Sequence, residues 1–112
     1  MGEPIVKLAN AILLSGIKQG AEAIRIRPDG VEVVVELLVD GETREELRGP
    51  VAVFGGVIRR LSVMANLPLY GKDQYATGFI ELVIGDATNV RFAIRVEGHG
   101  AEITAQLHLL RQ

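Results

Sequence analysis

The sequence has 112 residues, no cysteine and a net charge of -2, and nearly half of its residues are apolar. That length suits one domain with a single core, and no uncharged run approaches the about 20 residues that span a bilayer. The lack of cysteine excludes disulfide and thiolate chemistry, and the charge gives no electrostatic basis for nucleic-acid binding. We therefore expect a single cytoplasmic domain over residues 1–112 that neither enters a membrane nor binds nucleic acid.

The first half of the chain predicts a helix and three strands. Apolar residues recur at three- and four-residue spacing from Pro4 until Gly20, which is typical of an amphipathic helix. Alternating residues then predict strands at 24–27 and 31–39, joined by a turn at residues 28–30. Asp40-Gly41 is a strong hairpin signal, which returns the chain through residues 43–47 as a third, more polar strand.

The second half predicts another helix and three more strands. Gly49-Pro50 restarts a helical pattern that ends near Asn66, and Gly55-Gly56 within it implies either a weak first turn or close backbone packing. Residues 70–78 are polar and predict an irregular segment. Alternation at 79–84, 90–96 and 103–109 then predicts a three-stranded antiparallel meander.

These elements predict an α+β fold. In the order α-β-β-β-α-β-β-β, the two helices pack on an antiparallel sheet of about six strands.

No motif for catalysis or cofactor binding is complete. A phosphate-binding loop needs a glycine, four residues and then Gly-Lys-Ser/Thr, but the only Gly-Lys pair, Gly71-Lys72, has Asn66 and Asp73 at the flanking positions. Two histidines far apart, without cysteine, do not suggest a zinc site. The serines lack the sequence context of an activated nucleophile. We therefore expect a protein that is not an enzyme and has no cofactor or metal.

Two stretches of the chain nevertheless carry a family resemblance. Residues 3–28 and 60–67 resemble the N-terminal half of the hexameric ATPases of type II secretion and type IV pilus assembly, in the subdomain just before the nucleotide-binding core. The first helix, the Gly20-Ala21 turn, the following strand and Pro28 arrive in the family's order and spacing. The resemblance implies a fold usually called PAS-like.

The departures from that family concern polar positions. The family has Ser-Asp and then Ile-His-Ile-Glu-Pro where this chain has Glu22-Ala23 and then residues 24–28, which read Ile-Arg-Ile-Arg-Pro. The family's later arginine-rich segment, which can approach the nucleotide of the adjoining core, corresponds here to residues 68–78, which contain no arginine. Arg60 alone stands where the resemblance places a helix arginine. The resemblance thus implies a stand-alone relative that has lost nucleotide sensing.

Our leading hypothesis is a non-catalytic interaction or assembly module. Leu14 and Ala11 lie opposite the apolar stripe of the first helix, and Val34 and Leu38 interrupt the polar face of the second strand. Apolar residues on the wet face of a sheet suggest that something covers them, either a second copy in a homo-oligomer or a component of a secretion or pilus machine. The interaction candidates are Arg60, Leu14, Val34 and Leu38.

The alternative hypothesis is a small ligand sensor with a PAS-like fold. Its candidate residues all point away from the apolar faces of their strands and could receive a nucleotide phosphate, with residues 70–78 as a lid: Arg25, Arg27, Arg91 and Arg95. These arginines would form one patch only if their strands were neighbours. Glu32 and Glu36 on the adjacent strand instead favour a solvated lattice of cross-strand charges.

Overall fold

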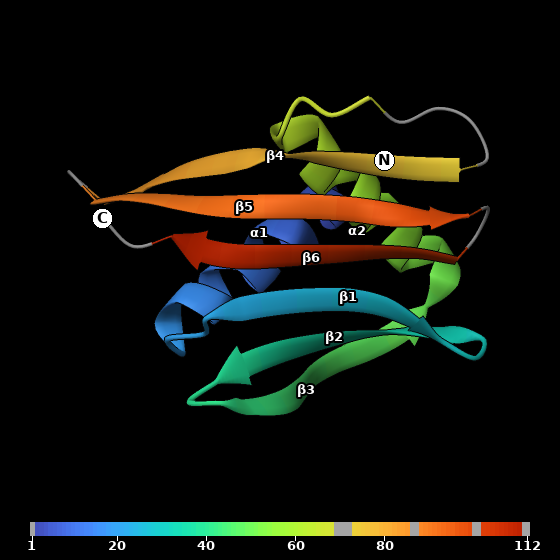
Figure 1. Ribbon diagram of the computed structural model, residues 1–112, viewed down its shortest axis with the longest axis horizontal. Coiled ribbons are helices and arrows are strands. Elements are labelled where there is room, and N and C mark those ends of the chain that lie inside the picture. The colour runs from blue at the N-terminus through green and yellow to red at the C-terminus, as the bar shows by residue number, and fades with distance from the viewer. Residues whose placement is uncertain (1, 69–72, 86–87, 100–101, 111–112) are drawn as a thin grey trace.

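The computed structural model describes residues 2–68, 73–85, 88–99 and 102–110 (Figure 1). Its helices and strands follow the predicted order: α1 (Glu3–Lys18), β1 (Ala23–Asp29), β2 (Glu32–Val39), β3 (Glu42–Pro50), α2 (Val51–Met64), β4 (Asp73–Ile84), β5 (Thr88–His99) and β6 (Glu102–Leu110). The strands form one six-stranded sheet in the order β3-β2-β1-β6-β5-β4, with antiparallel neighbours. This confirms the predicted α+β fold.

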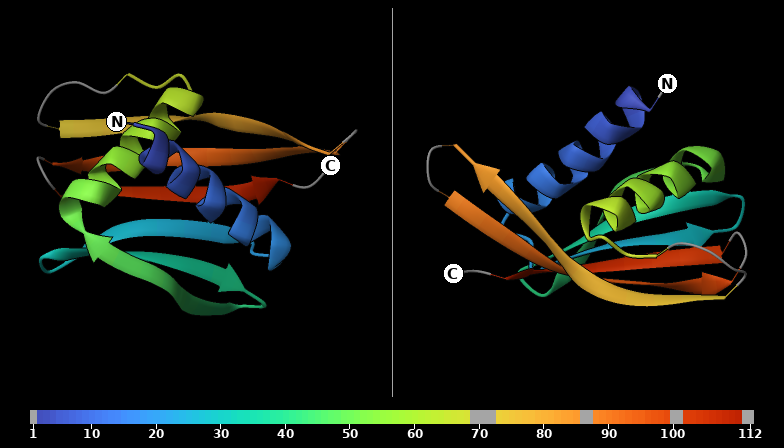
Figure 2. Two further views of the ribbon diagram at one scale, coloured as in Figure 1. Left: turned by 180° about the vertical axis from the view of Figure 1, so that it is seen from behind. Right: turned by 90° about the horizontal axis from the view of Figure 1, so that it is seen from above.

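The two helices pack on the same face of the sheet and leave the other face uncovered (Figure 2). We call the uncovered side the open face. Because side chains alternate along a strand, one set from each strand enters the core beneath the helices while the other lies on the open face. Ile24 and Ile26 of β1 are buried in the core, whereas Arg25 between them is exposed.

Local turn chemistry makes the first three strands a meander. Asp40 and Gly41 both have positive φ, 53° and 79°, which is the backbone of the two-residue hairpin that their sequence predicts. Gly30 has φ 66° in the turn between β1 and β2. A second meander, β4-β5-β6, follows α2, and the pairing of β1 with β6 joins the two meanders into one sheet.

Glycines lie at two of the contacts that the helices make. A Cβ on Gly56 would lie 3.4 Å from Ile5 of α1, which is an ordinary van der Waals contact, so packing between the helices does not require glycine at this position. Gly55 is exposed and meets nothing within 4 Å. Gly16 of α1 lies against β1, where an added Cβ would be 2.7 Å from Ile24 Cδ1.

The prediction of an irregular segment at 70–78 is wrong for residues 73–78, which begin β4, and residues 70–72 lie outside the described part. The alternation was hidden because this is an edge strand with the small residues Ala76 and Gly78 on its inner side. Gly78, for example, is small because Leu67 packs there, only 2.9 Å from where a Cβ would be. Residues 73–78 therefore do not form the lid that the sensor hypothesis assigned to them.

A pair of glycine substitutions tests this backbone geometry. Gly98 has φ 155°, and a Cβ there would lie 2.3 Å from the carbonyl oxygen of Glu102, so Gly98→Ala should lower the free energy of unfolding by about 2 kcal/mol or more. Gly55→Ala, in the middle of α2 with open space around it, should raise that free energy by about 0.5–1 kcal/mol. Urea unfolding of both variants measures the difference, and equal effects would contradict the described backbone.

Candidate functional site

Two rows of side chains cross the centre of the open face. The strand registers place residues of β2, β1, β6, β5 and β4 side by side, in that order. The first row is largely apolar and consists of Leu38, Ala23, His108, Ala93 and Phe79. The second row is polar and consists of Glu36, Arg25, Gln106, Arg95 and Thr77. The open face therefore carries an apolar strip beside a polar one.

These rows line two shallow hollows that meet at the middle of the sheet. One hollow lies over β1 and β2 and includes Leu38 and Arg25, and the other lies over β4 and β5 and includes Phe79 and Arg95. Both hollows are bordered by Gln106 and His108 of β6, so they lie side by side. Each hollow therefore has an apolar surface next to a guanidinium group.

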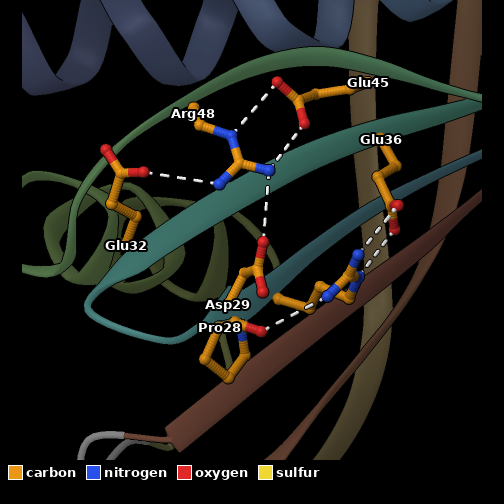
Figure 3. Close-up of polar contacts among 7 residues, drawn as sticks. Pro28, Asp29, Glu32, Glu36, Glu45 and Arg48 are labelled. Carbon is orange, nitrogen blue, oxygen red and sulfur yellow. Dashed lines mark hydrogen bonds and ion pairs between the residues drawn. The ribbon is translucent and has the colours of Figure 1, made fainter.

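Around the β1–β2 hollow, a lattice of charges crosses the sheet (Figure 3). The Arg27 guanidinium donates two hydrogen bonds to the Glu36 carboxylate, from Nε at 2.9 Å and from Nη2 at 3.1 Å. These bonds are the main reason that the pKa of Glu36 is lowered, and they raise the pKa of Arg27. Arg27 thus already has an anionic partner, as the predicted charge lattice implies.

Arg48 of β3 is the second centre of this lattice. Its guanidinium lies 2.7 Å from Glu45 Oε1, 3.1 Å from Asp29 Oδ2 and 3.3 Å from Glu32 Oε1 (Figure 3). Hydrogen bonding from Arg48 lowers the pKa of Glu45, and the carboxylates raise the pKa of Arg48. Three strand segments are joined here, but the groups are solvent-exposed, so each pair contributes little alone.

The four arginines proposed as ligand residues do not form one patch, because β6 lies between β1 and β5. Arg91 Nη2 is 2.7 Å from Glu81 Oε1, and its guanidinium stacks 4.7 Å from the centre of the Phe79 ring. Arg95 donates to the Gln106 side chain and lies 3.5 Å from Glu97. Arg25 and Arg95, which flank Gln106 in one row, are the two that the sheet brings to the shared hollows.

The expectation that Val34 is exposed is wrong, although it does lie on the open face. Its side chain is only 1% exposed and its cross-strand neighbours are Arg27 and Arg48. Long arginine side chains cover adjacent apolar surface with their methylene groups while their charged ends stay in water. Because both guanidinium groups are held by carboxylates, Val34 is covered from within the domain.

The other interaction candidates lie on two different sides of the molecule. Leu38 is half-buried in the β1–β2 hollow of the open face. Leu14, which is exposed as predicted, lies on α1, and Arg60 is half-buried on α2 with its Nε atom buried and without a hydrogen-bond partner among the described residues. The four candidates therefore do not make a single surface.

The open face also has an aromatic part that was not among the predicted site residues. Tyr75 and Phe79 of β4 are 69% and 51% exposed, and Val83 on the same strand is 72% exposed. These three residues are four positions apart, a spacing that fits a helix as well as one face of a strand, so the sequence alone did not reveal this row. Within the described residues there is no group of three or more histidine, cysteine or acidic side chains placed to hold a metal ion.

The lowered pKa values predict a particular pH dependence. Because the folded-state pKa values of Glu36, Glu45 and Glu46 lie below the ordinary value of 4.5, these groups stabilise the fold above that pH, and the contribution is lost as the pH falls through the folded-state values. Glu36→Gln should therefore be modestly less stable than wild type at neutral pH and should lose less stability on acidification. Thermal unfolding across the acidic range measures this, with the exposed Glu3→Gln as control.

Comparison with known proteins is informative over nearly the whole chain, although no family model matches it. Type II secretion system ATPase E of Vibrio cholerae is 34% identical over 105 residues, which are 93% of this chain and 21% of that protein. Type IV pilus assembly ATPase PilB of Myxococcus xanthus is 30% identical over 93 residues, 83% of this chain and 16% of that protein. The type II secretion protein HxcR of Pseudomonas aeruginosa is 29% identical over 107 residues, 95% of this chain and 23% of that protein.

The chain thus spans about a fifth of the length of the curated relatives that it matches. Among the described residues, no helix has the length and apolar character needed to cross a membrane. The matches agree with the resemblance that the sequence itself carries. Nearly all of this chain is related to a segment of the type II secretion and type IV pilus ATPases.

Proposed function

We propose that the chain is a non-catalytic interaction module, related to the N-terminal subdomain of these ATPases, that docks on a protein component of a secretion or pilus machine in the cytoplasm. The observation that carries the proposal is the open face, where the apolar strip and guanidinium groups line two adjacent hollows. The missing phosphate-binding motif supports the non-catalytic role, because no other segment of the sequence offers a cradle for a triphosphate.

The charges of the open face indicate what its partner presents. Glu36, the carboxylate that lines the β1–β2 hollow, is already bound by Arg27, whereas Arg25 and Arg95 line the hollows beside apolar residues. A partner segment with a carboxylate next to an apolar side chain would match both strips. Such a contact buries Leu38 and Phe79 and gives Arg25 a charged acceptor, whereas Arg95 would gain one in addition to Glu97, which lies 3.5 Å away.

The ligand sensor remains a second candidate, supported by one observation. Arg25 and Arg95 flank Gln106 in the same row, so a phosphate between them could accept hydrogen bonds from both guanidinium groups. Against it, the geometry separates the four arginines, and Arg27, Arg91 and Arg95 already contact carboxylates. The sensor would therefore use two arginines rather than four.

Substitutions on opposite sides of the molecule test the docking proposal. Leu38→Glu introduces a charge into the apolar strip and should weaken binding to the cognate secretion or pilus component by about tenfold or more, the loss of about 1.4 kcal/mol. Leu14→Glu on α1 is the matched control and should bind like wild type. Calorimetric titration with each purified component measures the affinities. Binding that Leu14→Glu weakens while Leu38→Glu does not would move the docking site to the helices.

Thermal melting with nucleotides separates the two candidate functions. A ligand present at about a hundred times its dissociation constant stabilises a protein by about 2.7 kcal/mol, which raises the melting temperature measurably. We expect no shift with ATP, GTP or cyclic dinucleotides. A shift that Arg95→Glu abolishes would instead support the sensor, and hydrolysis of a nucleotide would contradict the non-catalytic role.

A further inference from the structure

The two edges of the sheet differ in how they are protected. Edge strand β3 carries charged residues along its length, pairs irregularly with β2 at Val35/Glu36 and ends at Pro50. Charges, bulges and proline are the features by which natural sheets prevent another strand from adding to an edge. We therefore expect no further strand to pair with the outer side of β3.

Edge strand β4 has no bulge, no proline and few charges, and Leu67 packs against its helix side at Gly78. It runs from Asp73 to Ile84 and pairs with β5 in unbroken register along all 12 residues. Between residues 75 and 83 it has no proline and one charged residue, Glu81, which Arg91 neutralises at 2.7 Å. Tyr75, Phe79 and Val83 stand exposed at this edge on the open face. A long, regular and largely apolar edge is a template for strand addition.

We propose that this edge pairs with β4 of a second copy of the chain, antiparallel and about a two-fold axis at Phe79. Such an axis places β4 of one copy antiparallel to β4 of the other, so residues of the two copies whose numbers sum to 158 face each other. On the open face Phe79 meets the second copy's Phe79, Tyr75 meets Val83, and Thr77 meets Glu81. On the helix side Ala76 is paired with Leu82, and Gly78, on which Leu67 of the same chain packs, is paired with Ile80.

Neighbouring registers fit less well. An axis at Gly78 places Tyr75 against Glu81, an axis at Ile80 places Phe79 against Glu81, and an axis at Glu81 places two carboxylates face to face. The register about Phe79 gives aromatic and β-branched contacts with no like charges opposed. A second copy supplies this complementary pattern by symmetry, whereas a foreign strand would have to reproduce it, so the sequence of β4 favours self-pairing.

The expected dimer is a continuous sheet of two domains. In Figure 1, β4 is the outermost strand of the sheet, so a second copy can pair with it. An axis perpendicular to the sheet places the helices of both copies on one side and both open faces on the other. The proposal does not depend on the docking function, because it concerns the backbone edge of β4 rather than the hollow that contains Leu38. Leu38→Glu should accordingly leave the dimer intact.

Single-cysteine variants test the register, because the chain has no cysteine of its own. In the proposed dimer the two copies of Phe79→Cys face each other at a separation that a disulfide can bridge. Mild oxidation should convert Phe79→Cys to a covalent dimer, whereas Val83→Cys, which faces Tyr75 of the second copy, should stay monomeric on a non-reducing gel. A mixture of Tyr75→Cys and Val83→Cys should cross-link. Equal cross-linking of Phe79→Cys and Val83→Cys alone would overturn the proposal.

A charge swap at the same position gives an independent measurement. Phe79→Lys and Phe79→Glu should each be monomeric in analytical ultracentrifugation, because like charges then meet at the axis, and an equimolar mixture should restore the dimer. Circular dichroism verifies that both variants fold, as expected for an exposed residue. A wild-type chain that is monomeric at every concentration, or a dimer that survives in each variant alone, would overturn the proposal.

Discussion

The pairing of β1 with β6 is the contact on which the rest of the domain depends. Residues 23–26 meet residues 105–108 over four registered pairs, and this short ladder is the only join between the two meanders in the described sheet. It brings together segments about 80 positions apart, so it orders a long stretch of chain for few hydrogen bonds. The apolar side chains beneath it, Ile24, Ile26, Ala105 and Leu107, are fully buried and supply the compensating stabilisation.

The same ladder builds the candidate site. It places Ala23 beside His108 and Arg25 beside Gln106, so the join between the meanders is also the line along which the two hollows meet. The first hollow is lined by both meanders, because Gln106 and His108 of β6 border it together with residues of the first meander, whereas the second hollow lies within the second meander. The surface that we assign to docking therefore exists only once the whole sheet has formed.

Sequence reasoning predicted most of the elements because their signals are local. The period of α1, the Asp40-Gly41 turn and the alternation in β5 each lie within a few residues, and all three are confirmed. The predictions that were wrong concern residues whose environment is set by neighbours remote in sequence. Val34 was expected to be exposed, and only the register shows that Arg27 and Arg48 flank it. Residues 73–78 lack apolar alternation, and only their pairing with β5 makes them a strand.

The strand order could not be derived from local signals either, and it determines which of the four arginines lie near one another. Two meanders can join through several strand pairs, and a direct β1–β5 contact would have placed Arg25, Arg27, Arg91 and Arg95 together. In the observed order β6 lies between β1 and β5, and only Arg25 and Arg95 lie in the same row, on either side of Gln106. Charge patterns along single strands thus predict which face a residue occupies far better than which residues it will meet.

The positions at which the resemblance implies that β1 differs from the secretion ATPases all lie on one side of the sheet. Ile24 and Ile26, which follow the family's apolar skeleton, are buried beneath the helices, whereas Ala23, Arg25 and Arg27, which depart from it, lie on the open face. Core positions are constrained by packing, so they change little when a domain takes a new role. Substitution confined to the opposite face alters recognition without altering the fold. This separation is the physical reason to seek the chain's own activity on the open face rather than in the helices.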